Sequence, residues 1–92
     1  MLTPDSFAIA KSSLISSSIG DETIVLDGDC GTYFTLTGSG NRIWELLKER
    51  RKVLSICEVL RAEYDVPQER CQSDVLELLH KLNFHGLIEV DG

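Results

Sequence analysis

The feature that most constrains the fold is a change of hydrophobic period at Gly38-Ser39-Gly40. Before these residues, the segment Thr32 to Leu36 has the β-branched and aromatic content of a strand, and its period of two places Phe34 and Leu36 on one face. After them, apolar residues recur at the spacing of a helix, at Ile43, Trp44, Leu46 and Leu47. A strand therefore runs through a short turn directly into an amphipathic helix.

Two further strands are predicted upstream of this joint. Leu14 to Ile19 has apolar ends, and Glu22 to Leu26 is rich in β-branched residues; the two-residue turn Gly20-Asp21 lies between them. A second turn over residues 27–31 leads into the strand Thr32 to Leu36. These segments predict a three-stranded antiparallel meander. Residues 1–12 are expected to form an arm or a short extra strand.

Three helices are predicted after the meander. The first covers about three turns and ends in the basic run 48–52, where positive charge suits the helix dipole. The second begins at the capping box Ser55-Ile56-Cys57-Glu58, with Leu54 and Val59 as its hydrophobic staple, and ends near Tyr64. The third opens at Pro67 and ends at Gly86, and residues 87–90 follow as a short strand or extended tail.

The predicted fold class is therefore α+β, a winged helix-turn-helix-like domain with a three-stranded antiparallel sheet followed by three helices, spanning residues 1–92 as one domain. On the third helix, one arc is expected to face the core and consists of Cys71, Val75, Leu78, Leu79 and Leu82. Leu76 falls about 100° off the centre of this arc, beside Gln72. It is either the wall of a groove or a single exposed leucine without a role.

Composition and motifs argue against several functional classes. The net charge of −6 does not suit a phosphate-binding surface. Cys30, Cys57 and Cys71 form no C-x-x-C pair, and the latter two are expected to be buried apolar residues. His80 and His85 lack the i, i+4 spacing of a helical metal pair. We therefore expect no catalytic residues, no metal site and no cofactor.

The location of the protein is also constrained by the chain. No apolar run approaches the roughly 18 to 20 residues that a membrane span needs. The N-terminal segment, residues 1–5, has no basic residue ahead of an apolar stretch, as a signal peptide would. A cytoplasmic protein that contacts neither membrane nor nucleic acid is expected.

The predicted meander leaves its third strand as an edge. An edge strand that combines polar and aromatic residues and lies beside a helix can accept an additional strand from a peptide. Backbone hydrogen bonds would then supply binding, and pockets for alternate side chains would supply selectivity.

Three segments resemble the PqqD-like family, whose small domains recognise the leader peptides of ribosomally made, enzymatically modified peptides. They are Glu22 to Leu26, the joint Gly31 to Leu47, and the run from Tyr64-Asp65-Val66 through Asp74-Val75, Leu78-Leu79 and Leu82 to Gly86-Leu87-Ile88. Leu36-Thr37 stands where the family often has Leu-Asn. The chain looks most like the free-standing recognition protein of lasso peptide biosynthesis, although free-standing domains also serve pyrroloquinoline quinone and radical-enzyme pathways.

The resemblance implies a peptide site, partners and the absence of catalysis. In the family, the leader adds as an antiparallel strand to the third strand and lies against the third helix. Carried over, the site would consist of Gly31, Thr32, Tyr33, Phe34, Thr35, Leu36, Gln72, Val75, Leu76 and Leu79. The implied partners are a precursor leader peptide, a leader peptidase of the cysteine-protease type and, as a further candidate, a cyclase. The alternative from another class is a DNA-binding winged helix, a transcription-regulator module.

Overall fold

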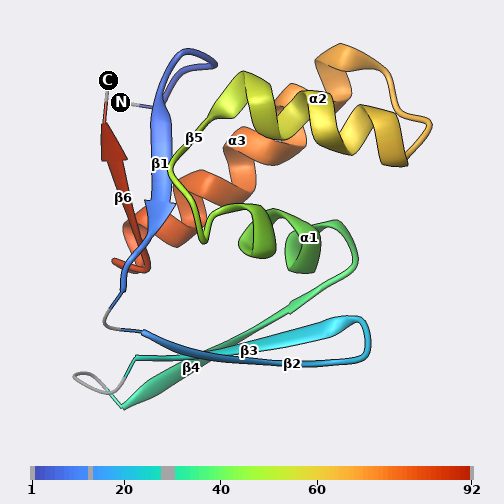
Figure 1. Cartoon of the computed structure of the whole chain (residues 1–92). Coiled ribbons are helices and arrows are strands. Elements are labelled where there is room, and N and C mark those ends of the chain that lie inside the picture. The colour runs from blue at the N-terminus through green and yellow to red at the C-terminus, as the bar shows by residue number, and fades with distance from the viewer. Residues whose placement is uncertain (1, 13, 28–30, 92) are drawn as a thin grey trace.

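The computed structural model describes residues 2–12, 14–27 and 31–91. Within them, two small antiparallel sheets lie beside and below three helices in the view of Figure 1. The elements in chain order are β1 (Phe7–Ala10), β2 (Ile15–Ile19), β3 (Glu22–Asp27), β4 (Thr32–Thr37), α1 (Ser39–Leu46), β5 (Arg51–Lys52), α2 (Val53–Glu63), α3 (Gln68–Phe84) and β6 (Ile88–Asp91). The predicted α+β class is confirmed.

The first sheet has the strand order β2-β3-β4 and confirms the predicted meander. Ile19 is paired with Glu22 across a two-residue turn, in which Gly20 has φ of 61°. A positive φ at the first turn residue favours glycine and is typical of a type II′ hairpin turn. In the second hairpin, Val25 is paired with Phe34. Residues 28–30 of the predicted second turn, Cys30 included, lie outside the described residues.

The second sheet, with the order β5-β1-β6, was not predicted as a sheet. β1 is the strand alternative expected for residues 1–12, and its residue Ala8 is paired with Arg51 on one side and Val90 on the other. Ala8 is only 1% exposed. The sheet therefore joins the two ends of the chain to the segment between α1 and α2, as Figure 1 shows.

The prediction that the basic run 48–52 ends a helix is wrong. α1 begins after Gly38, whose φ of 58° and ψ of −129° favour glycine, and ends at Leu46. Arg51 and Lys52 instead form β5, because backbone groups of β1 are available to pair with them. Arg50 reaches across the same sheet, with its guanidinium 4.1 Å from the ring centroid of Phe7.

The predicted capping box at Ser55 is also wrong. α2 begins at Val53, and no side chain caps its first turn. The N–H of Val53 donates to the carbonyl of Ser6 at 2.9 Å, and that of Leu54 donates to the carbonyl of Pro4 at 3.2 Å. The N-terminal segment therefore satisfies the first free N–H groups of α2, and Ser55 lies inside the helix. The predicted end near Tyr64 is confirmed, since Tyr64 is the C-cap.

α3 begins and ends as predicted. Pro67 is its N-cap, and Gly86 follows its C-terminus with φ of 73°. The N–H of Leu87 donates to the carbonyl of Leu82 at 2.9 Å, and that of Gly86 donates to the carbonyl of Asn83 at 3.0 Å. This pair of bonds is a Schellman motif, which turns the chain into β6.

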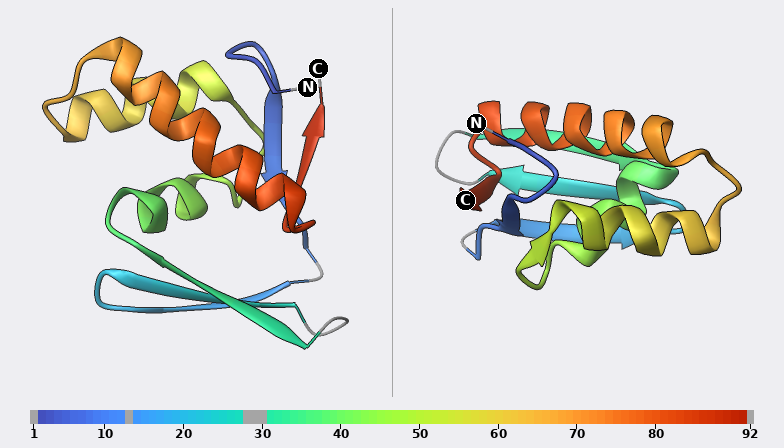
Figure 2. Two further views of the ribbon diagram at one scale, coloured as in Figure 1. Left: turned by 180° about the vertical axis from the view of Figure 1, so that it is seen from behind. Right: turned by 90° about the horizontal axis from the view of Figure 1, so that it is seen from above.

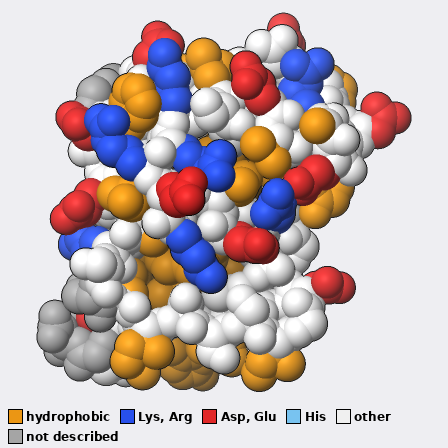
Figure 3. Space-filling view, in the orientation of Figure 1, with side chains coloured by type: hydrophobic (Ala, Val, Ile, Leu, Met, Phe, Trp, Pro, Cys, Tyr) orange, Lys and Arg blue, Asp and Glu red, His pale blue; other side chains and the backbone are white. Residues whose placement is uncertain are grey.

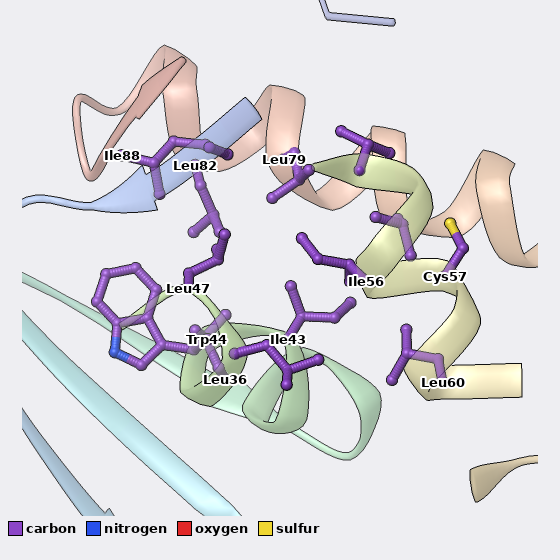
Figure 4. Close-up of a cluster of buried hydrophobic side chains, with 14 of the residues drawn as sticks. Leu36, Ile43, Trp44, Leu47, Ile56, Cys57, Leu60, Leu79, Leu82 and Ile88 are labelled. Atoms are coloured by element: carbon purple, nitrogen blue, oxygen red, sulfur yellow. The ribbon is translucent and has the colours of Figure 1, made fainter. Parts of the chain in front are cut away.

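The core lies where the three helices meet the inner faces of the sheets (Figure 4). Ile56, Val75 and Leu79 are fully buried, and the predicted burial of Cys57 and Cys71 is confirmed. In the described part of the chain, no helix combines the length and apolar character needed to cross a membrane.

Candidate functional site

A groove of about 650 Å³ lies between β4 and α3, with the start of α1 and the end of α2 at one end. Figure 2 (left) shows α3 crossing the back of the molecule, with β4 below it. We call this the β4–α3 groove. Its lining residues are Phe34, Thr35, Leu36, Thr37, Ser39, Gly40, Ile43, Leu60, Tyr64, Asp65, Val66, Arg70, Cys71, Asp74, Val75, Leu78, Lys81, Leu82 and His85.

The joint between β4 and α1 keeps one end of the groove open. Gly40 lies in the first turn of α1, and a Cβ atom added there would lie 3.6 Å from Cδ2 of Leu78 and 3.8 Å from Cδ2 of Leu36. These are ordinary van der Waals distances, so a methyl group would be tolerated. A longer side chain would extend into the space between α1 and α3, and Gly40 therefore leaves room in the groove.

β4 presents one face to the groove and one edge to solvent. Leu36 is 9% exposed and faces inward, whereas Tyr33 is 70% exposed on the opposite face, as predicted. In the described sheet, β4 is paired with β3 alone, so its other edge has no strand beside it. The backbone N–H and C=O groups along that edge are available to a further strand.

The structure brings together part of the predicted site. Phe34, Thr35, Leu36 and Val75 line the groove. Gly31 immediately precedes β4, the backbone of Thr32 belongs to β4, and the side chain of Tyr33 lies on the outer face. The predicted strand segment therefore coincides with one wall of the groove.

The predicted residues on α3 belong mostly to another flank of the helix. Gln72, Leu76 and Leu79 do not line the β4–α3 groove. Leu79 is fully buried and Leu76 is partly buried against the core. The flank that faces β4 instead carries residues three or four apart, which are Arg70, Asp74, Leu78, Lys81 and His85. Leu78, expected in the core arc, is half-buried on this flank.

Four of the groove residues that the sequence prediction missed are Gly40, Leu78, Lys81 and His85. Gly40 has no side chain and gives no pattern in the sequence. Lys81 and His85 look like solvent-exposed residues near a helix end, and Leu78 fits a core arc equally well. The spacing of Arg70, Asp74, Leu78 and Lys81 along one flank was a signal, but only tertiary structure shows that β4 lies beside it.

Cys71 lines the groove, and Cys57 is buried beside it. The thiol of Cys71 is 3% exposed and contacts the carbonyl oxygen of Cys57 at 3.7 Å. Burial, together with the neighbouring Cys71, raises the pKa of the Cys57 thiol to about 11. The Cys57 thiol is therefore protonated at neutral pH, which does not suit a nucleophile.

Each end of the groove is held by a side-chain contact. Arg42 of α1 donates three hydrogen bonds to the carboxylate of Glu63 in α2, two from Nε and one from Nη2, at 2.8–3.1 Å. These bonds lower the pKa of Glu63 and hold it beside Tyr64, which lines the groove. At the opposite end, the rings of Phe34 and His85 lie 4.8 Å apart.

A second surface lies on the outer face of the β2-β3-β4 sheet. Five large apolar side chains are exposed there, at 38–70%, and they are Ile15, Ile19, Ile24, Leu26 and Tyr33. The register places Ile15, Leu26 and Tyr33 in one cross-strand row. Figure 3 shows hydrophobic side chains along the lower border of the molecule, where Figure 1 places this sheet. We call this surface the outer sheet face.

Comparison with known families shows to which family this chain belongs. A sequence profile for coenzyme PQQ synthesis protein D (PqqD) matches residues 22–88, which include the whole groove. This chain belongs to the PqqD family. The predicted resemblance is thereby confirmed. No curated protein sequence matched the chain.

Two solved structures share the fold of this PqqD family member. TbiB1 in complex with the TbiA(beta) leader peptide is 33% identical, with a TM-score of 0.83, and the match covers 88% of this chain and 94% of TbiB1. A lasso peptide synthetase B1, complexed with the leader peptide, has 20% identity and a TM-score of 0.79, covering 89% of this chain and 96% of that protein. At that identity, the second match supports the fold alone.

Proposed function

We propose that this PqqD family member binds the leader region of a ribosomally made precursor peptide by strand addition to β4, in lasso peptide biosynthesis. The observation that carries the proposal is the β4–α3 groove, which runs alongside an edge of β4 that has no neighbouring strand in the described residues. Its similarity to TbiB1, solved with a leader peptide, supports the same conclusion.

The geometry allows binding and selection by different groups. The backbone of β4 can hydrogen-bond any added strand, because N–H and C=O groups are common to all sequences. Alternate side chains of that strand would point into the groove, where they would meet Leu36, Leu78 and the Phe34 ring. Selectivity would then come from the groove and affinity largely from the strand edge.

The proposed partner after binding is a leader peptidase of the cysteine-protease type, with a cyclase as a further candidate. The outer sheet face is the surface that we assign to the peptidase. A peptide strand added to β4 would continue this sheet, so a protein covering the outer sheet face would also touch the bound peptide. Exposed Ile15, Ile24 and Tyr33 supply the apolar contact that such an interface needs.

We further propose that the chain acts by binding alone. The precursor is made on ribosomes, so we expect the two to meet in the cytoplasm. DNA binding, the alternative class, is not favoured, because the charges of α3 include Glu69, Asp74 and Glu77, and Arg70 is paired with Asp74 at 3.9 Å. An acidic helix of this kind would be repelled by phosphate.

Binding can be tested with the two halves of the precursor encoded beside this chain's gene. Each half is labelled and titrated with the protein in a fluorescence polarisation assay. We expect the leader half to bind and the core half to remain free. Mass spectrometry of the same mixtures should show both peptides unchanged. Absent binding of the leader half, or equal binding of both halves, would contradict the proposal.

A substitution that fills the groove tests where the leader binds. Gly40→Leu should leave the protein folded, because the backbone at Gly40 is helical and an added Cβ fits at 3.6 Å, yet the longer side chain should obstruct the groove. Lys48→Leu is the matched control, since Lys48 is exposed just after the same helix and does not line the groove. Weak leader binding by the first variant and normal binding by the second are expected. Equal binding by both would place the leader elsewhere.

The partner surface needs a separate assay. Ile24→Ser on the outer sheet face should slow leader cleavage by the peptidase encoded in the same gene cluster, without changing leader binding. If cleavage of the bound precursor is as fast as with the parent protein, the outer sheet face is not the peptidase surface.

A further inference from the structure

The charged residues of the β4–α3 groove are separated by sign along its length. Lys81 lies at the end where the His85 ring contacts Phe34, near the start of β4. Asp65 and Asp74 lie toward the opposite end, where Gly40 approaches Leu78. Seven residues of helix separate Asp74 from Lys81, which corresponds to about 10 Å along α3. The two ends of the groove therefore carry side chains of opposite charge.

Ion pairs already present differ between the two ends. Arg70 is paired with Asp74 at 3.9 Å, which leaves Asp65 as the excess charge at that end. Lys81 has no ion-pair partner among the residues that the structure describes. Its ammonium group is exposed at the groove and available to a carboxylate from outside the chain.

Other charged residues near the Lys81 end of the groove do not line it. The Nζ atom of Lys11 lies 3.7 Å from the position that a Cβ atom on Gly86 would occupy, just after α3. Asp27 lies at the end of β3, paired in register with Thr32, and is engaged in an interaction of its own. Glu77 lies one turn before Lys81 on α3 but does not line the groove. Among the described residues, Lys81 is therefore the acidic or basic side chain that lines the groove at this end, apart from the His85 imidazole.

The backbone of a sheet edge cannot by itself select one peptide, because every peptide offers the same N–H and C=O groups. Charge at the two ends of the groove can both select a segment and favour one direction of binding. An antiparallel strand on β4 would run from the Gly40 end toward the Phe34 end, since β4 runs the opposite way.

From this polarity we infer that Lys81 is a specificity-determining residue that meets an acidic side chain on the C-terminal side of the strand-forming segment of the leader. A basic side chain on the N-terminal side is the counterpart favoured by Asp65. The inference rests on the proposed function and specifies the class of peptide that the groove takes.

The expected effect is modest, because the pair remains partly exposed to water. A surface ion pair changes an equilibrium by roughly two- to fivefold, and salt weakens it. Apolar contacts and backbone hydrogen bonds would still provide most of the affinity. Charge would decide between peptides that fit the groove equally well.

A charge scan of the labelled leader half tests the inference. Glutamate and lysine are placed in turn at each position C-terminal to the strand-forming segment, and each peptide is titrated with the parent protein by fluorescence polarisation. We expect glutamate to bind roughly two- to fivefold more tightly than lysine at one or two positions. The preference should reverse with Lys81→Glu and shrink as salt is raised.

Lys48→Glu is the matched control for net charge. Lys48 is exposed in the turn after α1 and does not line the groove, so this variant should keep the parent's preference at every position. A preference that is absent in the parent, or unchanged in Lys81→Glu while thermal melting shows a folded protein, overturns the inference. An equal shift in both variants also overturns it, because long-range charge would then explain the effect. If the parent protein bound none of the leader peptides, the proposed function itself would be refuted.

Discussion

The two sheets of this small PqqD family member have edges of different character. In the β5-β1-β6 sheet, both edge strands carry charged residues, namely Arg51, Lys52, Glu89 and Asp91. In the β2-β3-β4 sheet, neither edge strand carries a charge, since β2 reads Ile-Ser-Ser-Ser-Ile and β4 reads Thr-Tyr-Phe-Thr-Leu-Thr. Charged side chains on an edge discourage pairing with another chain, so the β5-β1-β6 sheet is protected and the β2-β3-β4 sheet is open.

The sheets also differ in what they connect. The β5-β1-β6 sheet joins both ends of the chain to the start of α2, and its central residue Ala8 is buried. The β2-β3-β4 sheet is continuous in sequence, and only its β4 edge has a helix beside it to form a groove. One sheet therefore closes the fold, and the other presents a strand and a groove to a partner.

The largest expected effect comes from introducing a charge into the closing sheet. Ala8→Asp should destabilise the protein by on the order of 3 kcal/mol or more, because the carboxylate would be buried without a partner. Ser17→Asp on the exposed strand β2 should change stability by no more than about 0.5 kcal/mol. Denaturant unfolding of both variants measures the difference. Similar losses of stability in the two variants would contradict the view that the β5-β1-β6 sheet closes the fold while the β2-β3-β4 sheet is open to a partner.

The next prediction separates the two flanks of α3. Leu78→Ala should weaken leader binding by about 1.5 kcal/mol, roughly tenfold in Kd, because a leader side chain in the groove would lose an apolar partner. Leu76→Ala should leave binding unchanged, since Leu76 does not line the groove. Thermal melts of the same samples control for folding. The groove assignment fails if Leu76→Ala weakens binding and Leu78→Ala does not.

Proline substitutions compare the two open edges directly. A proline at Tyr33, Phe34 or Thr35 removes a backbone donor, and each hydrogen bond lost to the leader should cost on the order of 1 kcal/mol of binding. Because successive N–H groups of a strand alternate in direction, neighbouring variants should differ, one losing binding and the next losing stability. Ser16→Pro and Ser17→Pro on β2 should not affect binding by any variant that folds. Weaker binding by folded β2 variants would place the leader on the β2 edge and contradict its assignment to β4.

The last prediction concerns the buried thiol of Cys57 in α2, and near pH 9 its effect on stability is the smallest. The pKa of Cys57 is raised to about 11 by burial, above the 9.0 of an ordinary thiol. The unfolded chain therefore loses this proton at lower pH than the folded chain does. The contribution of Cys57 to the free energy of unfolding is fully present below pH 9 and is lost as the pH rises from 9 toward 11. Unfolding curves of the parent and Cys57→Ala over that range check it, and the parent should show the steeper decline. Equal slopes would mean that the thiol is not shielded from water.

The predictable parts of the fold were those with local causes. The β2-β3-β4 meander follows from strands separated by short turns, and the ends of α3 follow from Pro67 and Gly86. The other sheet combines segments of two to four residues from distant parts of the chain, too short to show a period. The false capping box at Ser55 has a related cause, because the cap of α2 is provided by carbonyls of Pro4 and Ser6, far away in sequence.

The candidate site was predictable on its strand side and not on its helix side. A period of two identified the inward face of β4 at Phe34 and Leu36. On α3, Leu76 beside Gln72 and Leu78 beside Asp74 form two mixed flanks that look alike in sequence. Which of them faces β4 depends on how the helices pack, and the predicted residues Gln72, Leu76 and Leu79 lie outside the groove lining.

The central claim is that the leader adds to β4 as a further strand. The most direct measurement is amide hydrogen exchange, followed by NMR for each residue, with and without the leader half. We expect exchange to slow at alternate amides of β4, with no change in β2 or in the β5-β1-β6 sheet. Unchanged exchange along β4 with saturating leader, or new protection along β2, would contradict the account.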